Sequence, residues 1–177
     1  IGVLMGGPST EREVSLKSGQ AVYAALKERG SDVVAIDLLT DSEEEVIEAI
    51  KKNRVGVAFL ALHGHFGEDG TIQAILEKHR IPFTGSRQEA SRLAMDKIAS
   101  RKKFLERKLS VPRNYDLRKN DNYNLSEIIA HFGAFPLVVK PCSHGSSIGI
   151  TLAEDEKGLK KSIEIAFGID ENIIVEE

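Results

Sequence analysis

Short apolar segments alternate with amphipathic segments along the first half of the chain. Apolar runs of strand length predict buried strands over residues 1–5, 32–39, 55–62 and 81–84. Between them, apolar residues recur at helical spacing and predict helices over residues 12–29, from residue 43 onward and over 71–79. Strands that alternate with helices in this order favour a doubly wound parallel sheet. We therefore expect an α/β domain over residues 1–85.

Two serines are placed to begin helices in this domain. Ser9 precedes the first helical segment and is its predicted N-cap. Ser42 and Glu45 form a capping box, in which each side chain bonds a backbone amide of the first helical turn. The residues that follow would supply the apolar face of this second helix: Val46, Ile47 and Ile50.

The pattern changes after about residue 86. A long basic segment over 89–109 predicts a helix that is interrupted near Asp96. Beyond it, strands are expected over 115–118, over 135–139, from Ile148 and over 173–176, with helices over 125–132 and 156–167. Hairpins mixed with helices favour an α+β domain over residues 86–177. The predicted fold class is thus α/β, with a doubly wound parallel sheet followed by an α+β domain.

Composition narrows the class of protein. Of 177 residues, 41% are hydrophobic and 29% are charged, which is ordinary for a folded globular chain. The formal net charge of −3 predicts no nucleic-acid partner, and no apolar run approaches membrane-spanning length. A single cysteine excludes an internal disulfide, which fits a reducing cytoplasm. The chain begins at Ile1 without methionine, so we expect both ends to be cut from a longer protein.

A lysine at the end of a predicted strand precedes a loop rich in glycine and serine. The loop contains Gly145, Ser146, Ser147 and Gly149, and Lys140 stands before it. Glycine tolerates positive φ, so such a loop can present backbone N–H groups to an anion, and a lysine adds a point charge suited to phosphate. The spacing is not that of a P-loop. A simple hairpin turn that happens to follow a lysine is the alternative.

Two more residues near these segments have alternative interpretations. Lys97 lies in the basic helical segment, where a solvated helix face is the ordinary explanation. Cys142 follows Lys140, so it is expected near any bound phosphate, and a buried, unreactive thiol is the alternative.

The predicted α/β domain carries candidate groups where its strands end. Glu11 follows the first strand, at the sheet edge where open α/β sheets bind ligands, and could hold a ligand ammonium. A helix-start acid is the alternative. His63 follows the third strand and is placed to meet a substrate. Its loop also holds two acids, Glu68 and Asp69, whose spacing fits metal motifs poorly and which could cap the next helix.

Several strings together resemble one family. They occur in this order: Ser-Thr-Glu-Arg-Glu-Val-Ser at 9–15, His-Gly-x-x-Gly-Glu-Asp-Gly at 63–70, Phe-Thr-Gly-Ser at 83–86, Met-Asp-Lys at 95–97, and Lys-Pro at 140–141 with Gly-Ser-Ser-x-Gly at 145–149. The chain thereby resembles the D-alanine–D-alanine ligases of the ATP-grasp superfamily over nearly its whole length. Two positions depart from the family pattern: Ala74 replaces a glycine, and Glu177 stands where a lysine is common.

The resemblance implies roles for the nucleotide-binding residues. Lys97 and Lys140 would hold ATP phosphates, and the segment containing Gly145, Ser146, Ser147 and Gly149 would close over them as a lid. Glu176 would begin the hinge strand and meet the adenine amino group. The second domain is then the central ATP-grasp domain.

The resemblance also implies how the first substrate is bound. Glu11 would bind the ammonium of the first D-alanine, and His63 would lie near its carboxylate. Ser146 would link the lid to this site, through Glu11. The implied reaction is ATP-dependent joining of two D-alanines through an acyl phosphate, for peptidoglycan precursor synthesis in the cytoplasm.

The family has a third domain, which carries the Mg²⁺ ligands and is absent from this chain. We therefore expect ATP and Mg²⁺ as cofactors, no metal ligand within residues 1–177 and no ligase activity from these residues alone. The expected partners are small molecules, D-alanine and ATP, with no nucleic acid or membrane, and a homodimer is left open. Alternatives are a D-alanine–D-lactate ligase, another ATP-grasp carboxylate–amine ligase, and a non-catalytic nucleotide-binding module.

Overall fold

A computed structural model describes residues 1–177 as two units, Ile1–Leu93 and Ala94–Glu177. The boundary between the units lies between Leu93 and Ala94, after the point near residue 86 where the sequence pattern changes. The limits of the two predicted domains, 1–85 and 86–177, stay a prediction. Each unit has its own sheet and its own hydrophobic core.

Three parallel strands form the sheet of the first unit. β1 (Gly2–Gly6) is completely buried and lies between β2 (Val34–Leu38) and β3 (Ala58–Leu60). The prediction of a fourth strand over 81–84 is wrong, because a single parallel bridge, between Ala58 and Phe83, is all that joins this segment to the sheet. The ladder ends there because the Thr84 hydroxyl, rather than a backbone carbonyl, accepts the amide of Leu60.

Helices cover both faces of this sheet. α1 (Arg12–Glu28) packs on one face, where Val3 and Met5 meet its apolar residues. α2 (Glu43–Lys52) and α3 (Thr71–Lys78) pack on the other face against Leu4. The expected apolar residues of α2 are buried, and the doubly wound arrangement is confirmed.

The two predicted helix starts differ in outcome. Ser42 accepts a hydrogen bond from the Glu45 amide, which is one half of the predicted capping box, while the Ser42 amide donates to the Thr40 hydroxyl at 3.0 Å rather than to Glu45. The prediction for Ser9 is wrong, because Glu11 occupies the N-cap position of α1 without a side-chain cap. The Ser9 hydroxyl instead accepts from the Glu11 amide and donates to the His63 carbonyl at 2.8 Å. It therefore joins two loops at the edge of the sheet.

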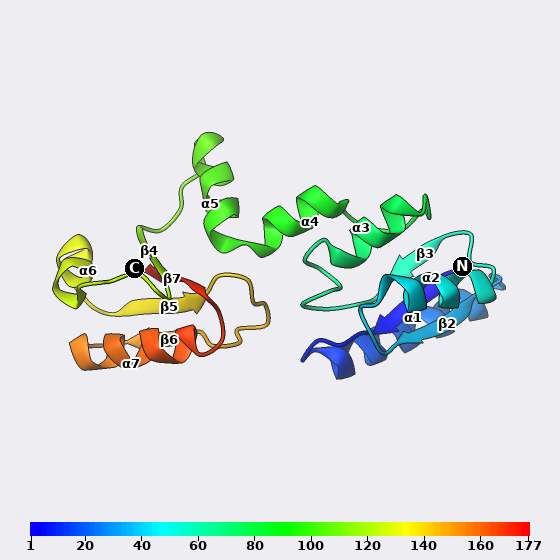
Figure 1. Cartoon of the computed structure of the whole chain (residues 1–177), viewed down its shortest axis with the longest axis horizontal. Helices are drawn as coiled ribbons and strands as arrows, with labels where there is room; N and C mark the ends of the chain where they lie inside the picture. The colour runs from blue at the N-terminus through cyan, green and yellow to red at the C-terminus, as the bar shows by residue number, and fades with distance from the viewer. The chain divides into compact units, whose positions relative to one another are not determined.

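An antiparallel sheet organises the second unit. Its strands lie in the order β4 (Asn114–Arg118), β7 (Asn172–Glu176), β5 (Leu137–Pro141) and β6 (Thr151–Ala153). α6 (Leu125–Phe132) and α7 (Glu156–Phe167) bury apolar residues against it, and α7 lies along β5 and β6 (Figure 1). This confirms the expected α+β organisation.

The basic segment forms two helices rather than one. α4 (Gln88–Met95) and α5 (Lys97–Glu106) are separated at Asp96, as predicted. Asp96 is the N-cap of α5 and accepts from the Ala99 amide. Lys97 is consequently the first residue of a new helix. No helix of the structure is both long and apolar enough to cross a membrane.

Candidate functional site

The ends of two neighbouring strands bring Glu11 and His63 to one edge of the first unit. β1 and β3 are parallel and adjacent, so the segments after them emerge at the same edge. The His63 ring lies with Nε2 3.0 Å from the Ser18 hydroxyl of α1 and with Nδ1 3.7 Å from a Glu68 carboxylate oxygen. Helix and loop therefore hold the imidazole from both sides.

Gly64 leaves the space that the Glu11 carboxylate occupies. A Cβ atom built at Gly64 would lie only 2.3 Å from Glu11 Oε2, and the φ angle of Gly64 is +66°. The positive φ favours glycine, and any side chain at this position would push the Glu11 carboxylate away. Glu11 and the residue after His63 are thus in contact, which brings the carboxylate to the loop that carries the imidazole. An acid and an imidazole on the same edge of a sheet can receive an ammonium and a carboxylate from one small molecule.

We predict that Gly64→Ala displaces Glu11. In the full-length protein, the KM for a small substrate that carries an ammonium should rise at least about tenfold, because loss of a charge-assisted contact costs roughly 1.5–3 kcal/mol. Steady-state kinetics would measure it. Gly56→Ala is the matched control, since a Cβ there meets no atom within 4 Å. An unchanged KM in the Gly64 variant would contradict the placement of Glu11.

The loop after His63 is held by its own acids. Glu68 accepts from the Gly64 amide at 2.7 Å, while Asp69 accepts from the Phe66 amide at 2.9 Å and the Thr71 amide at 3.0 Å. Asp69 therefore contacts the first residue of α3, but Gly70 is the N-cap of this helix and has no side-chain cap, so the capping alternative holds only for that one contact of Asp69. No group of three or more His, Cys, Asp or Glu residues that could hold a metal ion occurs in residues 1–177.

In the second unit, Lys97 is tied to the loop that follows β5. Its ammonium donates to the carbonyls of His144 at 2.6 Å and Cys142 at 3.3 Å. Burial lowers the pKa of Lys97, and the nearby charge of Lys140 acts in the same direction. Two lysines from different elements therefore lie near each other, which is an arrangement suited to an anion.

Lys140 and Glu176 meet on one face of the sheet. The Lys140 ammonium pairs with Glu176 Oε2, and Arg101 Nη1 donates to Glu176 Oε1 at 2.6 Å. The predicted adenine contact of Glu176 is not tested by these contacts and stays a prediction. Glu177, where the family often has lysine, pairs instead with Arg113 at 2.7 Å.

The loop between β5 and β6 has an unusual backbone. Ser146, Ser147 and Gly149 have φ angles of +49°, +60° and +71°. A Cβ at Gly149 would lie 2.4 Å from Ile169 Cδ1, so glycine is required there for packing as well. Within the loop, the Ile148 amide donates to the Gly145 carbonyl at 3.0 Å and the Ile150 amide to the Ser147 carbonyl at 3.2 Å. These two amides are engaged in turns. The link from Ser146 to Glu11 stays a prediction.

Cys142 is buried, as the alternative interpretation held. Its thiol lies 3.1 Å from Asp96 Oδ1, and burial raises its pKa from the ordinary value of 9.0 to about 11.

Because the thiolate is the reactive form, we predict that iodoacetamide alkylates Cys142 of the folded protein near pH 8 at least about a hundredfold more slowly than it alkylates the denatured chain. Mass spectrometry with and without urea would measure both rates. Comparable rates would show that the thiol is accessible.

Two contacts of the site residues were missed by sequence analysis. Ser18 contacts His63, and Arg101 contacts Glu176. Arg101 follows Lys97 by one helical turn, so its position on the same face of α5 was a usable signal. Ser18 offered no such signal, because only the sheet topology brings α1 beside the end of β3.

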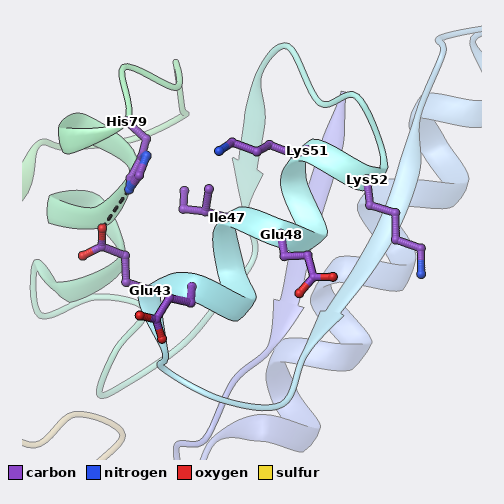
Figure 2. A pocket seen from close by; sticks show the side chains of 7 residues that line it. Glu43, Ile47, Glu48, Lys51, Lys52 and His79 are labelled. Atoms are coloured by element: carbon purple, nitrogen blue, oxygen red, sulfur yellow. Dashed lines mark hydrogen bonds and ion pairs between the residues drawn. The ribbon is translucent and has the colours of Figure 1, made fainter.

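A groove on the first unit contains none of the predicted site residues. It has a volume of about 670 Å³ and lies over α2 beside His79, as Figure 2 shows. Glu43 at its rim pairs with Lys78 at 2.7 Å and with His79 at 2.8 Å. The hydrogen bond with Lys78, followed by the one with His79, lowers the pKa of the Glu43 carboxyl. The ion pairs tie α2 to α3.

Models of one protein family match segments in both units of the chain. A family model described as the D-ala D-ala ligase N-terminus matches residues 39–86, and one described as the D-ala D-ala ligase C-terminus matches residues 108–177. A protein named D-alanine–D-alanine ligase from Geobacter sulfurreducens is 43% identical over 176 residues, which are 99% of this chain and 54% of that protein.

Solved structures of ligases have a similar fold. D-alanine–D-alanine ligase from Bacillus anthracis complexed with ATP has a TM-score of 0.86 and 35% identity, over 99% of this chain and 57% of that one. The VanG D-Ala:D-Ser ligase from Enterococcus faecalis has a TM-score of 0.82 and 30% identity, over 99% and 61%.

A unit with a parallel sheet followed by a unit with an antiparallel sheet is the organisation that this chain shares with these solved ligases. The chain belongs to the D-alanine–D-alanine ligase family. It spans about half the length of the curated relatives it matches.

Proposed function

We propose that this chain supplies the first-substrate site and part of the ATP site of an enzyme that joins two D-alanines at the expense of ATP. The observation that carries the proposal is that Lys97, which bonds the loop after β5, lies near enough to Lys140 to feel its charge, in a chain with these relatives. Two neighbouring ammonium groups suit a polyphosphate, because Lys140 shares its carboxylate, Glu176, with Arg101.

ATP is assigned to the second unit. Lys97 and Lys140 would hold its phosphates, and Glu176 would face the adenine. The segment with Gly145, Ser146, Ser147 and Gly149 would close over the phosphates and exclude water from the acyl phosphate. The Bacillus anthracis relative is described as complexed with ATP, which supports ATP as the ligand.

The first D-alanine is assigned to the edge of the first unit. Glu11 would bind its ammonium, and His63 would lie near its carboxylate. The Ser18 contact would hold the imidazole in place, and Ser146 would connect the lid to this site. The contact between Glu11 and Gly64 supports the assignment, because it aims the acid at the sheet edge.

The reaction follows in two steps. A carboxylate oxygen of the first D-alanine attacks the γ-phosphorus of ATP, which forms an acyl phosphate and releases ADP; positive charge stabilises this transfer. The amine of the second D-alanine then attacks the acyl carbon, and phosphate leaves. Mg²⁺ would neutralise phosphate charge and would be held by residues outside this chain. We place the reaction in the cytoplasm, as a step of peptidoglycan precursor synthesis; a homodimer stays a prediction.

The full-length protein tests the proposal. With ATP, Mg²⁺ and D-alanine, we expect equal amounts of ADP, phosphate and D-alanyl-D-alanine, measured by coupled assay and mass spectrometry. D-lactate and D-serine as second substrates would separate the ligase types. ATP binding without any ligated product, across these and other amino acids, would instead favour a nucleotide-binding module.

A further inference from the structure

Arg101 is a buried charged residue at the centre of the second unit. Only 8% of it is exposed, and it lies on α5 one turn after Lys97. Nη1 donates to Glu176 Oε1 at 2.6 Å, while Nη2 donates to Asn114 Oδ1 at 2.8 Å and to the Pro112 carbonyl. A buried arginine with partners on two segments is held in one place, since its planar fork makes several directed bonds at once.

Glu176 is shared between two cations. One of its carboxylate oxygens pairs with Arg101 and the other with Lys140, and Glu176 is itself 93% buried. The three groups carry two positive charges and one negative charge, so the cluster as a whole is positive. The Lys140 side chain is the more exposed cation, at 27%, while that of Arg101 is 9% exposed. The surplus charge is therefore available to a ligand at Lys140.

We infer that Arg101 is a positioning residue for the nucleotide phosphates. By neutralising one side of Glu176, it leaves Lys140 with positive charge for an anion. Without Arg101, Glu176 and Lys140 would form a neutral pair, and the attraction for a phosphate would fall, because buried charges are poorly screened. The inference rests on the proposed function, in which Lys140 binds an ATP phosphate.

The inference predicts a loss that depends on phosphate. In the full-length protein, Arg101→Met should weaken ATP binding roughly tenfold, the effect of one lost charged interaction. Adenosine binding should weaken less than about threefold. Arg101→Lys keeps the charge but not the fork, so ATP affinity should stay within about threefold of the parent while the melting temperature falls.

A double variant provides the sharpest test. Arg101→Met with Glu176→Gln removes one positive and one negative charge, which restores a net charge of +1 at Lys140. The ratio of ATP affinity to adenosine affinity, which cancels any change in the adenine contact of Glu176, should recover relative to Arg101→Met alone, whereas purely structural losses would leave that ratio unchanged. Lys102→Met, on the exposed face of the same helix, is the matched control and should leave ATP affinity unchanged.

Isothermal titration with ATP and adenosine, together with thermal melts, distinguishes the outcomes. Equal losses for ATP and adenosine in Arg101→Met, or an ATP loss in Arg101→Lys as large as in Arg101→Met, would overturn the inference and leave a structural role. If Arg101→Met does not fold, the Lys variant alone decides: ATP affinity within about threefold of the parent supports the inference, and a loss of about tenfold overturns it. Failure of the parent protein to bind ATP, or full ATP affinity in Lys140→Ala, would overturn the proposed function and the inference together.

Discussion

Replacing Phe66 with alanine should lower the free energy of unfolding of the first unit by about 3–5 kcal/mol, the usual cost of deleting a buried phenyl ring. Phe66 is completely buried in the core that joins the sheet to α2 and α3. It also has a φ angle of +72°, which a non-glycine residue adopts at a cost. The packing of the ring offsets that cost and holds the loop between His63 and Gly70.

Urea denaturation of the full-length protein, followed by a probe in the first unit, would measure the change. Phe104→Ala is the matched control, because Phe104 is 45% exposed and should change stability by less than about 0.5 kcal/mol. We also expect the KM for D-alanine to rise in Phe66→Ala, since the loop carries His63. Equal effects of the two substitutions would show that Phe66 does not anchor the loop.

Replacing Lys140 with alanine in the full-length protein should weaken ATP binding by more than about tenfold, because one charge-assisted phosphate contact of roughly 1.5–3 kcal/mol is lost. Arg101 remains to compensate Glu176, so the fold should tolerate the change. Lys97→Ala should weaken ATP binding similarly and should also loosen the loop, since its ammonium bonds two loop carbonyls.

Titration with ATP would measure both affinities, and Lys102→Ala controls for the loss of a lysine from α5. Limited proteolysis would separate the two site lysines: cleavage within 142–149 should accelerate in Lys97→Ala more than in Lys140→Ala. Unchanged ATP affinity in both variants would remove the phosphate assignment.

Local patterns in the sequence determined most of the elements. Helices α6 and α7 begin and end at the predicted residues, because their apolar periodicity and flanking polar residues are unambiguous. The break at Asp96 was likewise readable, since aspartate is a strong N-cap. The strand–helix alternation specified the doubly wound sheet, and the ordered strings specified the family.

Local patterns failed where a contact from elsewhere in the chain decides the outcome. The segment over 81–84 reads as a strand, yet its pairing ends when the Thr84 side chain takes the Leu60 amide. Ser9 reads as an N-cap, yet its hydroxyl is used to join the Glu11 and His63 loops. The burial of Cys142 was likewise unreadable from the sequence, while its nearness to a bound phosphate stays a prediction.

By itself, the sequence determined the fold class, the family and the types of groups at the candidate site, since these depend on local periodicity and on short motifs. The tertiary structure alone decided how those groups are combined. It placed Glu11 against Gly64, Ser18 beside His63, and Lys140 and Arg101 on opposite oxygens of Glu176. Each of these contacts joins residues far apart in sequence, and the register of the central strand β7 between β4 and β5 brings the last of them together.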